Sequence, residues 1–597
     1  MSHYRSNLRD LEFNLFDVHR VQDAVGGDNF PDLDEETMRQ ILGEVERLAS
    51  DEWAASYVDS DRIPIDLVDG EIELPRSLKE SLAALRRGGW DRLGASEELG
   101  GIVVPPVLFW ATQELLLGSN TAATFYAGGS LFARVLFEEG TDQQKELARL
   151  MVERGWAGTM VLTEPDAGSD VGAGVAKAME VGDGTWHIEG VKRFITGGEH
   201  DAAENIIHLV LARPEGARPG TKGLSLFAVP KYLVNDDGSL GARNGVLATG
   251  LEKKMGLKGS TTCELTFGLD EPAVGYLVGG VHDGIRQMFR VIEHARMLIG
   301  TKSAATLSTG YLNALEYSRE RVQGPDMTEL MNKMAPRVSI IKHPDVRRML
   351  MTQKAYAEGL RALWAYAASI QHLTFVDPTN DEHDRRLDLL LPLVKGYSSE
   401  KAFQLLALSL QVLGGSGYIM DYPIEQYIRD AKIDTVYEGT TGIQALDLFF
   451  RKIARDQGET LSRLSSEIVE FVKGGGDGDP LAAERALLGE MVEAVQSQIG
   501  VMVEHLMESM GGNAGEIYKT GLHANPLLFS LAEVVIAWQL LVHAEIALPM
   551  AGDDPFYEGK VASARYLVAD VAPRVTARAA AARRESGYLM VMSDEAF

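Results

Sequence analysis

The stretch NIIHLVLARPEGARPGTKGLSLFAVPK (residues 205–231) decides the fold class of this chain. It contains two short apolar runs, NIIHLVLAR and GLSLFAVPK, separated by a segment rich in Gly and Pro. Such runs are typical of β-strands joined by a turn, whereas a helix shows a longer pattern with a 3.6-residue period. The runs TWHIEG and CELTFG continue the pattern on either side. The sequence therefore predicts an antiparallel sandwich or barrel from about 156 to 275.

The sequence on both sides of this region has a helical pattern. Met38, Ile41, Leu42 and Val45 keep the i, i+3, i+4, i+7 spacing of one helix face, and similar patterns run through 280–455 and 481–597. We therefore predict an α+β fold with four parts. They are an N-terminal α-helical domain (1–155), a middle antiparallel β-domain (156–275), a C-terminal four-helix-bundle domain (276–455) and a helical extension domain (456–597).

Composition excludes several classes of function. The 58 Lys and Arg against 86 Asp and Glu give a net charge of −28, so neither nucleic acid nor an anionic membrane is an expected partner. Cys263 is the only cysteine, which excludes an intrachain disulfide, a zinc ribbon or an iron–sulfur cluster and fits a cytoplasmic protein. The histidines show no metal-ligand spacing, so no metal site is expected. Polar residues such as Glu533 and Gln539 interrupt the apolar run 527–548, which favours a buried helix over a transmembrane segment.

One acidic residue stands out in VYEGTTGIQ (436–444). Thr441 and Gln444 have the S/T-x-x-E/Q spacing of a capping box, which predicts a helix that starts there. This explanation leaves out Glu438, three residues earlier. A carboxylate held on a short loop beside free helix N–H groups suits a general base.

Two further motifs are open to more than one interpretation. MVLTEPDAGSDVG (160–172) is rich in turn formers, so it is either an ordinary surface turn or a loop that presents N–H groups and hydroxyls to a planar heterocycle or phosphate. LGGSG (413–417) looks like a dinucleotide fingerprint, but the run before it is helical. The sequence there predicts a helix C-terminus instead.

The order of these motifs resembles that of the acyl-CoA dehydrogenase family. After MVLTEPDAGSDVG come IEGVKRFITGG (188–198), KKMGLKGSTTCEL (253–265), IEHAR (292–296), SRERVQG (318–324), SLQVLGGSGY (409–418), QYIRDAKI (426–433) and YEGTTGIQ. The resemblance covers roughly residues 80–455. The chain continues for more than a hundred residues beyond it, as in the long branch that has a C-terminal helical extension and includes broad-range fatty acyl-CoA dehydrogenases.

The resemblance implies a function. It is the FAD-dependent α,β-dehydrogenation of fatty acyl-CoA thioesters, medium to long or broad in chain length, to trans-2-enoyl-CoA. It further implies electron-transfer flavoprotein as electron acceptor and a homodimer, since in long members the extension covers the face used for tetramers. The alternatives are a 3-methylthiopropionyl-CoA dehydrogenase, an acyl-CoA oxidase that uses O2, and a flavin-binding scaffold without catalysis.

The same resemblance implies roles for individual residues. Glu438 matches the catalytic base, and Ala295 occupies the place where other branches carry it. Glu438 should also offer its backbone N–H to the thioester oxygen. The residues implied to bind the substrate are Ser169, Glu293, Arg296, Tyr437 and Gly439, with a salt bridge inside the helical bundle as the alternative for Arg296.

A larger set is implied to bind FAD. It comprises Met160, Leu162, Thr163, Gly168, Ser169, Phe194, Ile195, Thr196, Arg321 and Thr440, with Gln411, Gly414 and Gly415 supplied by the neighbouring subunit. Two departures from the family pattern weaken this set. Val322-Gln323-Gly324 lacks an aromatic residue common after the arginine, and Gly442 replaces a polar residue.

Overall fold

A computed structural model describes residues 2–27, 29–182, 184–476 and 478–597. The chain forms two compact units. The first comprises Met1–Ser6 and Gly26–Ala295, and the second comprises Asn7–Val25 and Arg296–Phe597. The boundary at 295/296 falls inside one long helix, α8 (Gly284–Glu320).

The first unit begins with helices. They are α2 (Glu35–Leu48), α3 (Tyr57–Arg62), α4 (Arg76–Arg87), α5 (Pro106–Tyr126), α6 (Gly129–Glu139) and α7 (Asp142–Arg154), with a small hairpin of β1 (Leu67–Val68) and β2 (Glu71–Ile72). Local sequence sets their starts. Asp34 accepts the Thr37 N–H at the start of α2, and Thr141 with Gln144 forms a capping box at the start of α7.

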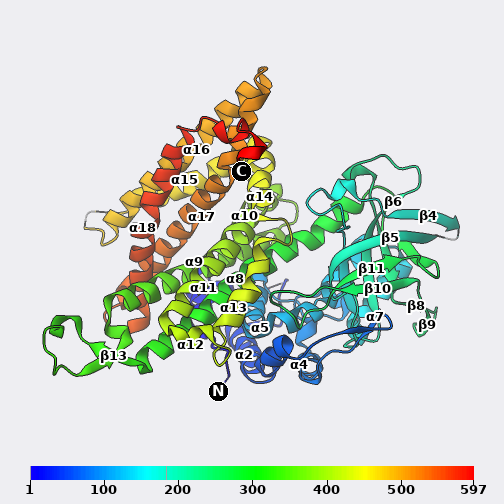
Figure 1. Ribbon diagram of the computed structural model, residues 1–597, viewed down its shortest axis with the longest axis horizontal. Coiled ribbons are helices and arrows are strands. Elements are labelled where there is room, and N and C mark those ends of the chain that lie inside the picture. Colours follow the sequence, from blue (N-terminus) through cyan, green and yellow to red (C-terminus); the bar gives the residue numbers. More distant parts are fainter. Residues whose placement is uncertain (1, 28, 183, 477) are drawn as a thin grey trace. The chain divides into compact units, whose positions relative to one another are not determined.

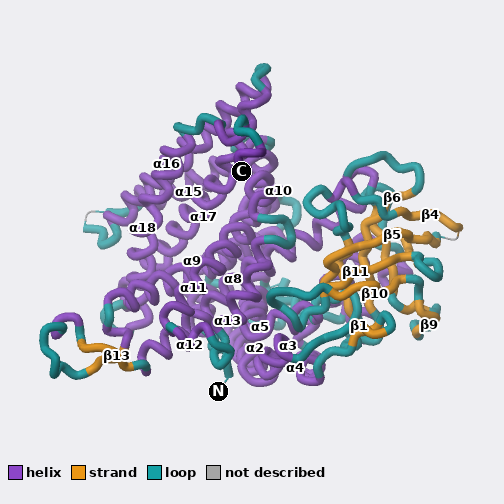
Figure 2. Tube along the Cα trace, in the orientation of Figure 1, coloured by secondary structure: helices purple, strands orange, loops and turns teal. Residues whose placement is uncertain are grey.

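Eight strands of the first unit form one sheet in the order β10-β11-β5-β12-β7-β6-β3, with β4 paired to both β5 and β6. Figure 2 draws the strands in orange. Their bounds are β3 (Ala157–Val161), β4 (Lys177–Gly182), β5 (Thr185–Thr196), β6 (Ile206–Pro214), β7 (Ser225–Pro230), β10 (Val246–Leu251), β11 (Thr262–Phe267) and β12 (Ala273–Leu277). A separate hairpin holds β8 (Tyr232–Val234) and β9 (Leu240–Arg243).

The expected middle β-domain is present, but it is not purely antiparallel. β3 and β4 both run parallel to β6, while the other pairs are antiparallel. Parallel pairing needs a long crossover connection. The long segment between β3 and β6, which includes β4 and β5, supplies it. β6 is buried along nearly its whole length, and its Leu209 and Leu211 share a core with Trp156 and Met288.

The second unit is helical (Figure 1). Besides the later part of α8 it contains α1 (Leu8–Glu12), α9 (Pro344–Val376), α10 (Asp381–Pro392), a π-helical turn η11 (Leu393–Tyr397), α11 (Ser398–Leu413), α12 (Gly415–Tyr418), α13 (Ile424–Lys432), α14 (Thr441–Leu446), η13 (Asp447–Ala454) and the hairpin of β13 (Val322–Pro325) with β14 (Arg337–Ser339). The extension contributes α15 (Glu459–Lys473), α16 (Ala482–Met510), α17 (Ile517–Ala547) and α18 (Pro555–Ala582). The predicted α+β fold class, with helical ends and a central β region, is confirmed.

α17 is the helix that the apolar run predicts. The described residues contain one helix, Ala514–Met550, that is long and apolar enough to cross a membrane, but 89% of its apolar window is buried inside the protein. Glu533 lies fully buried in its middle and pairs with Arg578 at 2.5 Å, and it accepts a hydrogen bond from the Tyr397 hydroxyl at 3.1 Å. A buried, paired carboxylate is expected in the core helix of a soluble protein.

The N-terminal segment is fixed to the second unit by a buried carboxylate. Asp10 is fully buried and receives hydrogen bonds at 2.5 Å from Arg361 of α9 and Lys560 of α18. These two positive charges hold the pKa of Asp10 well below its usual range, although burial alone would raise it. The pair of charges explains why Asn7–Val25 belongs to a unit whose other residues start at 296.

Candidate active site

The turn at Glu438 has a strained backbone. Glu438 has a φ of +55° and Gly439 a φ of +88°, so both residues are in the left-handed region. A residue other than glycine adopts this conformation at a cost of about 1–2 kcal/mol. Such conformations persist where surrounding contacts impose them, and they are frequent at active sites.

Two buried donors hold this turn. Gln444 of α14 donates from Nε2 to the Glu438 carbonyl at 2.9 Å. Lys395 of η11 donates from Nζ to the Gly439 carbonyl at 2.5 Å. Within the described residues, no acceptor lies within hydrogen-bond distance of the Glu438 backbone N–H. The two carbonyls are therefore fixed while this N–H stays available to a ligand.

The predicted capping box at Thr441 and Gln444 is wrong. The N-cap of α14 is Thr440, whose hydroxyl accepts the Ile443 N–H at 3.4 Å. Thr441 instead donates its hydroxyl to Glu400 at 2.7 Å. The amide of Gln444 turns back to the carbonyls of the strained turn, because those buried carbonyls have no helical partner.

The carboxylate of Glu438 has an unusual acidity. Burial raises its pKa to about 7, although the positive charges of Lys395 and Arg296 oppose the rise. The side chain is half-buried by surface area, so it sits deep among protein atoms and remains open to a ligand. A carboxyl group with a pKa near the working pH is suited to accept a proton.

Neighbouring ion pairs fix the surroundings of the turn. Arg296 pairs with Asp447 at 3.1 Å, which is the bundle salt bridge that the sequence left open. The Tyr437 hydroxyl donates to Asp434 at 2.6 Å, and Lys302 approaches the same carboxylate oxygen at 2.5 Å. The Tyr437 hydroxyl therefore points to the protein, and its backbone N–H donates to the Ile433 carbonyl at 3.1 Å.

In the first unit, residues predicted to bind flavin gather where β3 and β5 end. The Arg193 N–H donates to the Thr163 carbonyl at 2.8 Å, so the segment after β3 lies beside the end of β5. Phe194 has a φ of +61° and is 55% exposed. Ile195 is buried, whereas Thr163 and Thr196 are half-buried. An exposed aromatic ring near two half-buried threonines fits a planar heterocycle such as a flavin.

The EPDAGSD loop is anchored by Glu164. This buried carboxylate pairs with Lys192 at 2.8 Å and accepts the N–H groups of Val175 at 2.6 Å and Ala176 at 3.1 Å. Gly168 and Ser169 remain exposed at the end of the loop. In the sequence Glu164 stands before Pro165, which indicates only an extended backbone there. The buried lysine that it meets lies 28 residues away, so local pattern gave no signal of the pair.

The remaining predicted residues divide between the units. Met160 and Leu162 are half-buried at the end of β3, and Glu293 is half-buried on α8, all in the first unit. In the second unit, α11 ends at Gly414 with a φ of +61°, as the sequence predicts for LGGSG. Gln411, Gly414 and Gly415 are exposed there.

Arg321 lies near this turn in the second unit. It follows Tyr317 by one helical turn, and the Tyr317 hydroxyl lies 3.4 Å from the hydroxyl of Ser416. Arg321 is exposed. The structure therefore brings the helical turn before Arg321 beside Ser416, which follows the Gly414–Gly415 turn.

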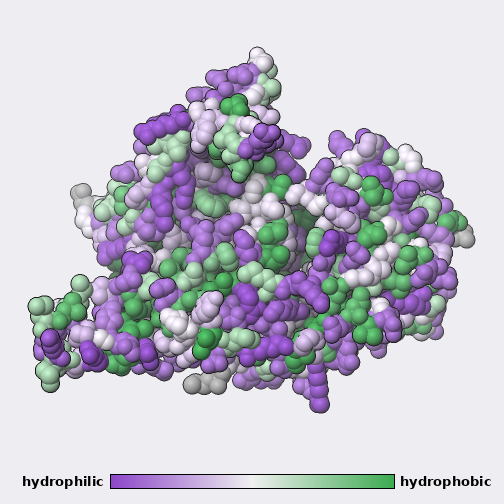
Figure 3. Space-filling model, in the orientation of Figure 1, coloured by the Kyte–Doolittle hydropathy of each residue, from purple (hydrophilic) through white to green (hydrophobic). Residues whose placement is uncertain are grey.

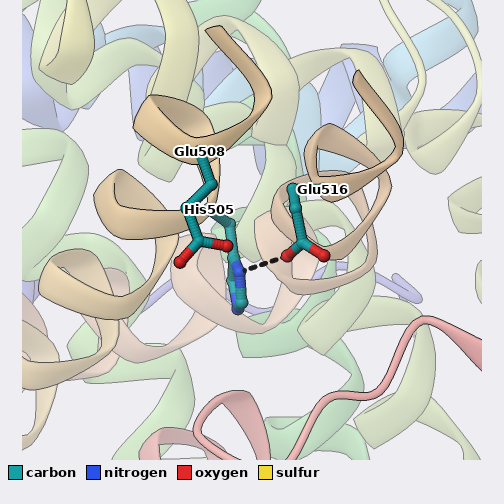
Figure 4. Close-up of side chains that lie close together, drawn as sticks. All are labelled: His505, Glu508 and Glu516. Carbon is teal, nitrogen blue, oxygen red and sulfur yellow. Dashed lines mark hydrogen bonds and ion pairs between the residues drawn. The ribbon is translucent and has the colours of Figure 1, made fainter. Parts of the chain in front are cut away.

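Within the described residues, one group has the composition of a metal site: His505, Glu508 and Glu516 (Figure 4). His505 Nδ1 lies 2.9 Å from Glu516, and Lys519 Nζ lies 2.9 Å from the same carboxylate. The positive charge of Lys519 already neutralises the Glu516 carboxylate, which a bound cation would need as a ligand. The expectation that the protein has no metal site remains a prediction.

Comparison with known families and proteins identifies the relatives of this chain. The family described as acyl-CoA dehydrogenase, middle domain, matches residues 159–268, the acyl-CoA dehydrogenase C-terminal domain matches 282–451, and an acetyl-CoA dehydrogenase C-terminal-like domain matches 464–593. The chain is 51% identical to the broad-specificity linear acyl-CoA dehydrogenase FadE5 of Mycobacterium tuberculosis, with 100% of both chains covered. It is 34% identical to a 3-methylmercaptopropionyl-CoA dehydrogenase of Ruegeria pomeroyi, with 94% of this chain and 95% of the relative covered.

Solved structures share the fold. An acyl-CoA dehydrogenase complexed with FAD from Bacillus anthracis superposes with a TM-score of 0.72 at 20% identity, covering 92% of this chain and 88% of that one. Caenorhabditis elegans ACDH-11 in complex with C11-CoA superposes with a TM-score of 0.70 at 20% identity, covering 94% and 90%. The fold, the three matched domains and the full-length identity together show that the chain belongs to the acyl-CoA dehydrogenase family and is an FAD-dependent oxidoreductase acting on acyl-CoA thioesters.

Proposed function

We propose that Glu438 is the base that removes the α-proton from linear acyl-CoA thioesters, medium to long in chain length, in a reaction that yields the trans-2-enoyl-CoA. The observation that carries this proposal is the strained, buried turn, where the pKa of Glu438 is raised to about 7 by burial. A carboxylate in water is too weak a base to remove a proton from an α-carbon. The bound acyl chain would exclude water from Glu438 and so raise the basicity of its carboxylate further.

Each group of the turn has a place in this reaction. The carboxylate of Glu438 accepts the α-proton, and its free backbone N–H donates to the thioester carbonyl oxygen, which acidifies the α-carbon. The chemistry that bound FAD would supply is acceptance of the hydride that leaves the β-carbon. Gly439 allows the substrate to approach the backbone, and the Tyr437 ring, the guanidinium of Arg296 and the side chain of Glu293 remain the proposed contacts to the rest of the substrate.

The residues that would hold FAD have fitting chemistry. Phe194 offers a ring face, and Thr163 and Thr196 offer hydroxyls to the polar edge of the flavin, beside Met160, Leu162 and the backbone of Ile195. Gly168 and Ser169 offer N–H groups to a phosphate. Thr440 is committed to capping α14 but stands next to the base.

We further propose a homodimer in which Gln411, Gly414 and Gly415 bind the FAD of the neighbouring subunit, while Arg321 meets the phosphates of FAD. Large apolar side chains are exposed directly after Gly415, namely Tyr418 (79%), Ile419 (47%) and Met420 (53%). The hairpin of β13 and β14 exposes further apolar side chains on the surface that Figure 3 colours by hydropathy, among them Met331 (97%). A second copy of the chain would cover such a surface. Ile419→Asp should convert the dimer to monomer in light scattering and lower FAD retention; an unchanged dimer would contradict the assignment.

The proposed substrate range follows the relatives. The 51% identity to a broad-specificity linear acyl-CoA dehydrogenase outweighs the 34% identity to a 3-methylmercaptopropionyl-CoA dehydrogenase. We propose electron-transfer flavoprotein as acceptor in the cytoplasm, where the single, buried Cys263 suits a reducing environment. Oxygen uptake with stoichiometric peroxide release during turnover would instead identify an oxidase.

The deciding experiment is an anaerobic titration of the purified flavoprotein. Acyl-CoAs of increasing length and 3-methylthiopropionyl-CoA are added in turn, and loss of the visible absorbance of the oxidised flavin is followed. Rapid bleaching by a range of linear acyl-CoAs is expected. Bleaching by 3-methylthiopropionyl-CoA alone would overturn the proposed range, and no bleaching by any thioester would overturn the function.

A further inference from the structure

Lys395 is a buried lysine beside the base that no step of the proposed function uses. It is fully buried and lies in η11, a π-helical turn that follows Pro392 at the end of α10. π-Helical turns are rare and occur frequently at functional sites. The turn aims the Lys395 ammonium at the Gly439 carbonyl, 2.5 Å away.

We propose that Lys395 is a positioning residue for Glu438: it holds the strained Glu438–Gly439 turn through the Gly439 carbonyl and keeps the base ionised by its positive charge. The proposal rests on Glu438 being the base. In this role Lys395 acts through the Glu438–Gly439 turn and does not itself contact the reacting atoms.

The strained backbone of Glu438 and Gly439 is the geometric reason for a positioning role. Glu438 at +55° and Gly439 at +88° would relax toward ordinary conformations unless their peptide groups were held. Gln444 holds the Glu438 carbonyl at 2.9 Å and reaches the Gly439 carbonyl only at 3.4 Å, so Lys395 is the close donor to the Gly439 carbonyl. Gly396 allows this close approach, because a Cβ there would come within 3.2 Å of the Gln444 Cβ.

The electrostatic part follows from the charges that face Lys395. Asp434, Glu438 and Glu400 are the acidic groups near it, and Arg296 is the basic one. Asp434 is already paired with Lys302, and Arg296 with Asp447. Among the residues that the structure describes, no carboxylate forms an ion pair with Lys395, so its charge acts on the Glu438 carboxylate and opposes the effect of burial. Burial lowers the pKa of Lys395 to about 8, so it still carries its charge at neutral pH.

The test compares three substitutions of Lys395. Lys395→Met removes charge and donor, Lys395→Gln removes the charge but keeps a donor, and Lys395→Arg keeps both. The matched control is Lys401→Met, which removes a buried lysine near Glu533 rather than near Glu438. All four are purified with FAD and compared with the wild type.

The first readout is the acidic limb of the pH profile of kcat/KM. We expect Lys395→Met and Lys395→Gln to move this limb to higher pH by about one unit, because loss of a nearby opposite charge raises a carboxyl pKa by this order. Lys395→Arg and Lys401→Met should leave the limb in place. An unmoved limb in either uncharged variant, or an equal shift in Lys395→Arg, would overturn the electrostatic role.

Two further readouts do not depend on turnover. The protonated-carboxyl infrared band of Glu438, isolated as the difference from Glu438→Gln, should titrate at higher pH in Lys395→Gln than in the wild type. Amide hydrogen exchange of residues 439–446 should accelerate in Lys395→Met and not in Lys401→Met. Unchanged exchange would overturn the anchoring role. If Lys395→Met does not fold, Lys395→Gln and Lys395→Arg decide the electrostatic role.

Failure of this inference is distinguishable from failure of the proposed function. If Glu438→Gln were bleached by acyl-CoA as fast as the wild type, Glu438 would not be the base. If Glu438→Gln is inactive but the limb does not move in the uncharged Lys395 variants, only the inference about Lys395 fails.

Discussion

Two buried glutamates, one in each unit, show what separates a structural carboxylate from a reactive one. Glu164 in the first unit has a lysine and two backbone N–H groups within hydrogen-bond distance, and these hold its pKa below the usual value although burial opposes them. Glu438 in the second unit has nearby positive charges, and burial raises its pKa to about 7. Burial is therefore not the signature of a base. A carboxylate becomes poised when it is desolvated and its charge is only partly compensated.

The largest expected effect is on Glu438. Glu438→Gln should slow flavin reduction by acyl-CoA by up to about 10⁴-fold, the upper end of what a positioned general base contributes. Anaerobic stopped-flow absorbance measures the rate, and unchanged FAD content serves as the control. A loss of less than tenfold would contradict the contrast between the two glutamates.

The same substitution should stabilise the protein at alkaline pH. Because the folded-state pKa of Glu438 is raised to about 7, the folded state binds this proton more tightly than the unfolded state, and stability falls as pH rises to that value. Glutamine avoids this penalty, so Glu438→Gln should gain on the order of 1–3 kcal/mol at pH 8 and little near pH 5. Urea unfolding at the two pH values measures the difference.

Glu164→Gln should have the opposite outcome. It leaves the buried Lys192 uncompensated, which costs about 3–5 kcal/mol at neutral pH. Since the pKa of Glu164 is lowered by folding, its stabilisation is present above the unfolded-state pKa and is lost as pH falls through the folded-state value, so the two proteins should converge in acid. The exposed Glu189→Gln on β5 is the matched control in thermal unfolding. Similar melting temperatures for both variants at pH 7 would break the comparison.

A smaller effect is expected at Gly439. A Cβ there would lie 2.6 Å from the Gln444 amide nitrogen, and a φ of +88° is strained for alanine. Gly439→Ala should lower kcat at least tenfold, with a stability loss of about 1–2 kcal/mol. Gly442→Ala, at the second residue of α14, meets only Thr440 at 4.0 Å and should retain activity. Equal activity of the two variants would show that the turn geometry does not matter.

The smallest expected effect is a gain at Gly442. This position has room for a side chain, and we propose that the chain lacks one contact to FAD here. Gly442→Ser should bind FAD about 2- to 10-fold more tightly, as one net hydrogen bond would provide. Equilibrium dialysis of the flavin measures it, and Gly442→Ala separates the hydroxyl from the helix-propensity gain.

The sequence predicted the fold class because periodicity is local. The change from helical patterns to the short runs around 205–231 is visible within each segment. Glu438 stands out in the sequence for a similarly local reason, because the expected helix start at Thr441 leaves this acid unexplained. The capping prediction failed because Thr440 and Thr441 are adjacent threonines, and only the structure shows that Glu400 takes the second hydroxyl.

The buried residues that hold the site carboxylates and carbonyls in place could not be predicted from local patterns. Lys395 lies 44 residues before the carbonyl it holds, and Lys192 lies 28 residues after Glu164. Asp10 meets Lys560 across 550 residues. Pairs like these are made by tertiary packing, and no local pattern encodes them.

The extension has a consequence for how such enzymes change over evolution. α17 packs against η11 and α14, the two elements that hold the Glu438 turn, and Leu528 approaches within 3.3 Å of where a Cβ on Gly396 would stand. Tyr397, next to it, is fully buried with its hydroxyl on Glu533 of α17. A descendant that lost the residues after about 455 would expose to water the faces of η11 and α14 that α17 covers. Loss of the extension would therefore have to be accompanied by substitutions at Gly396 and Tyr397.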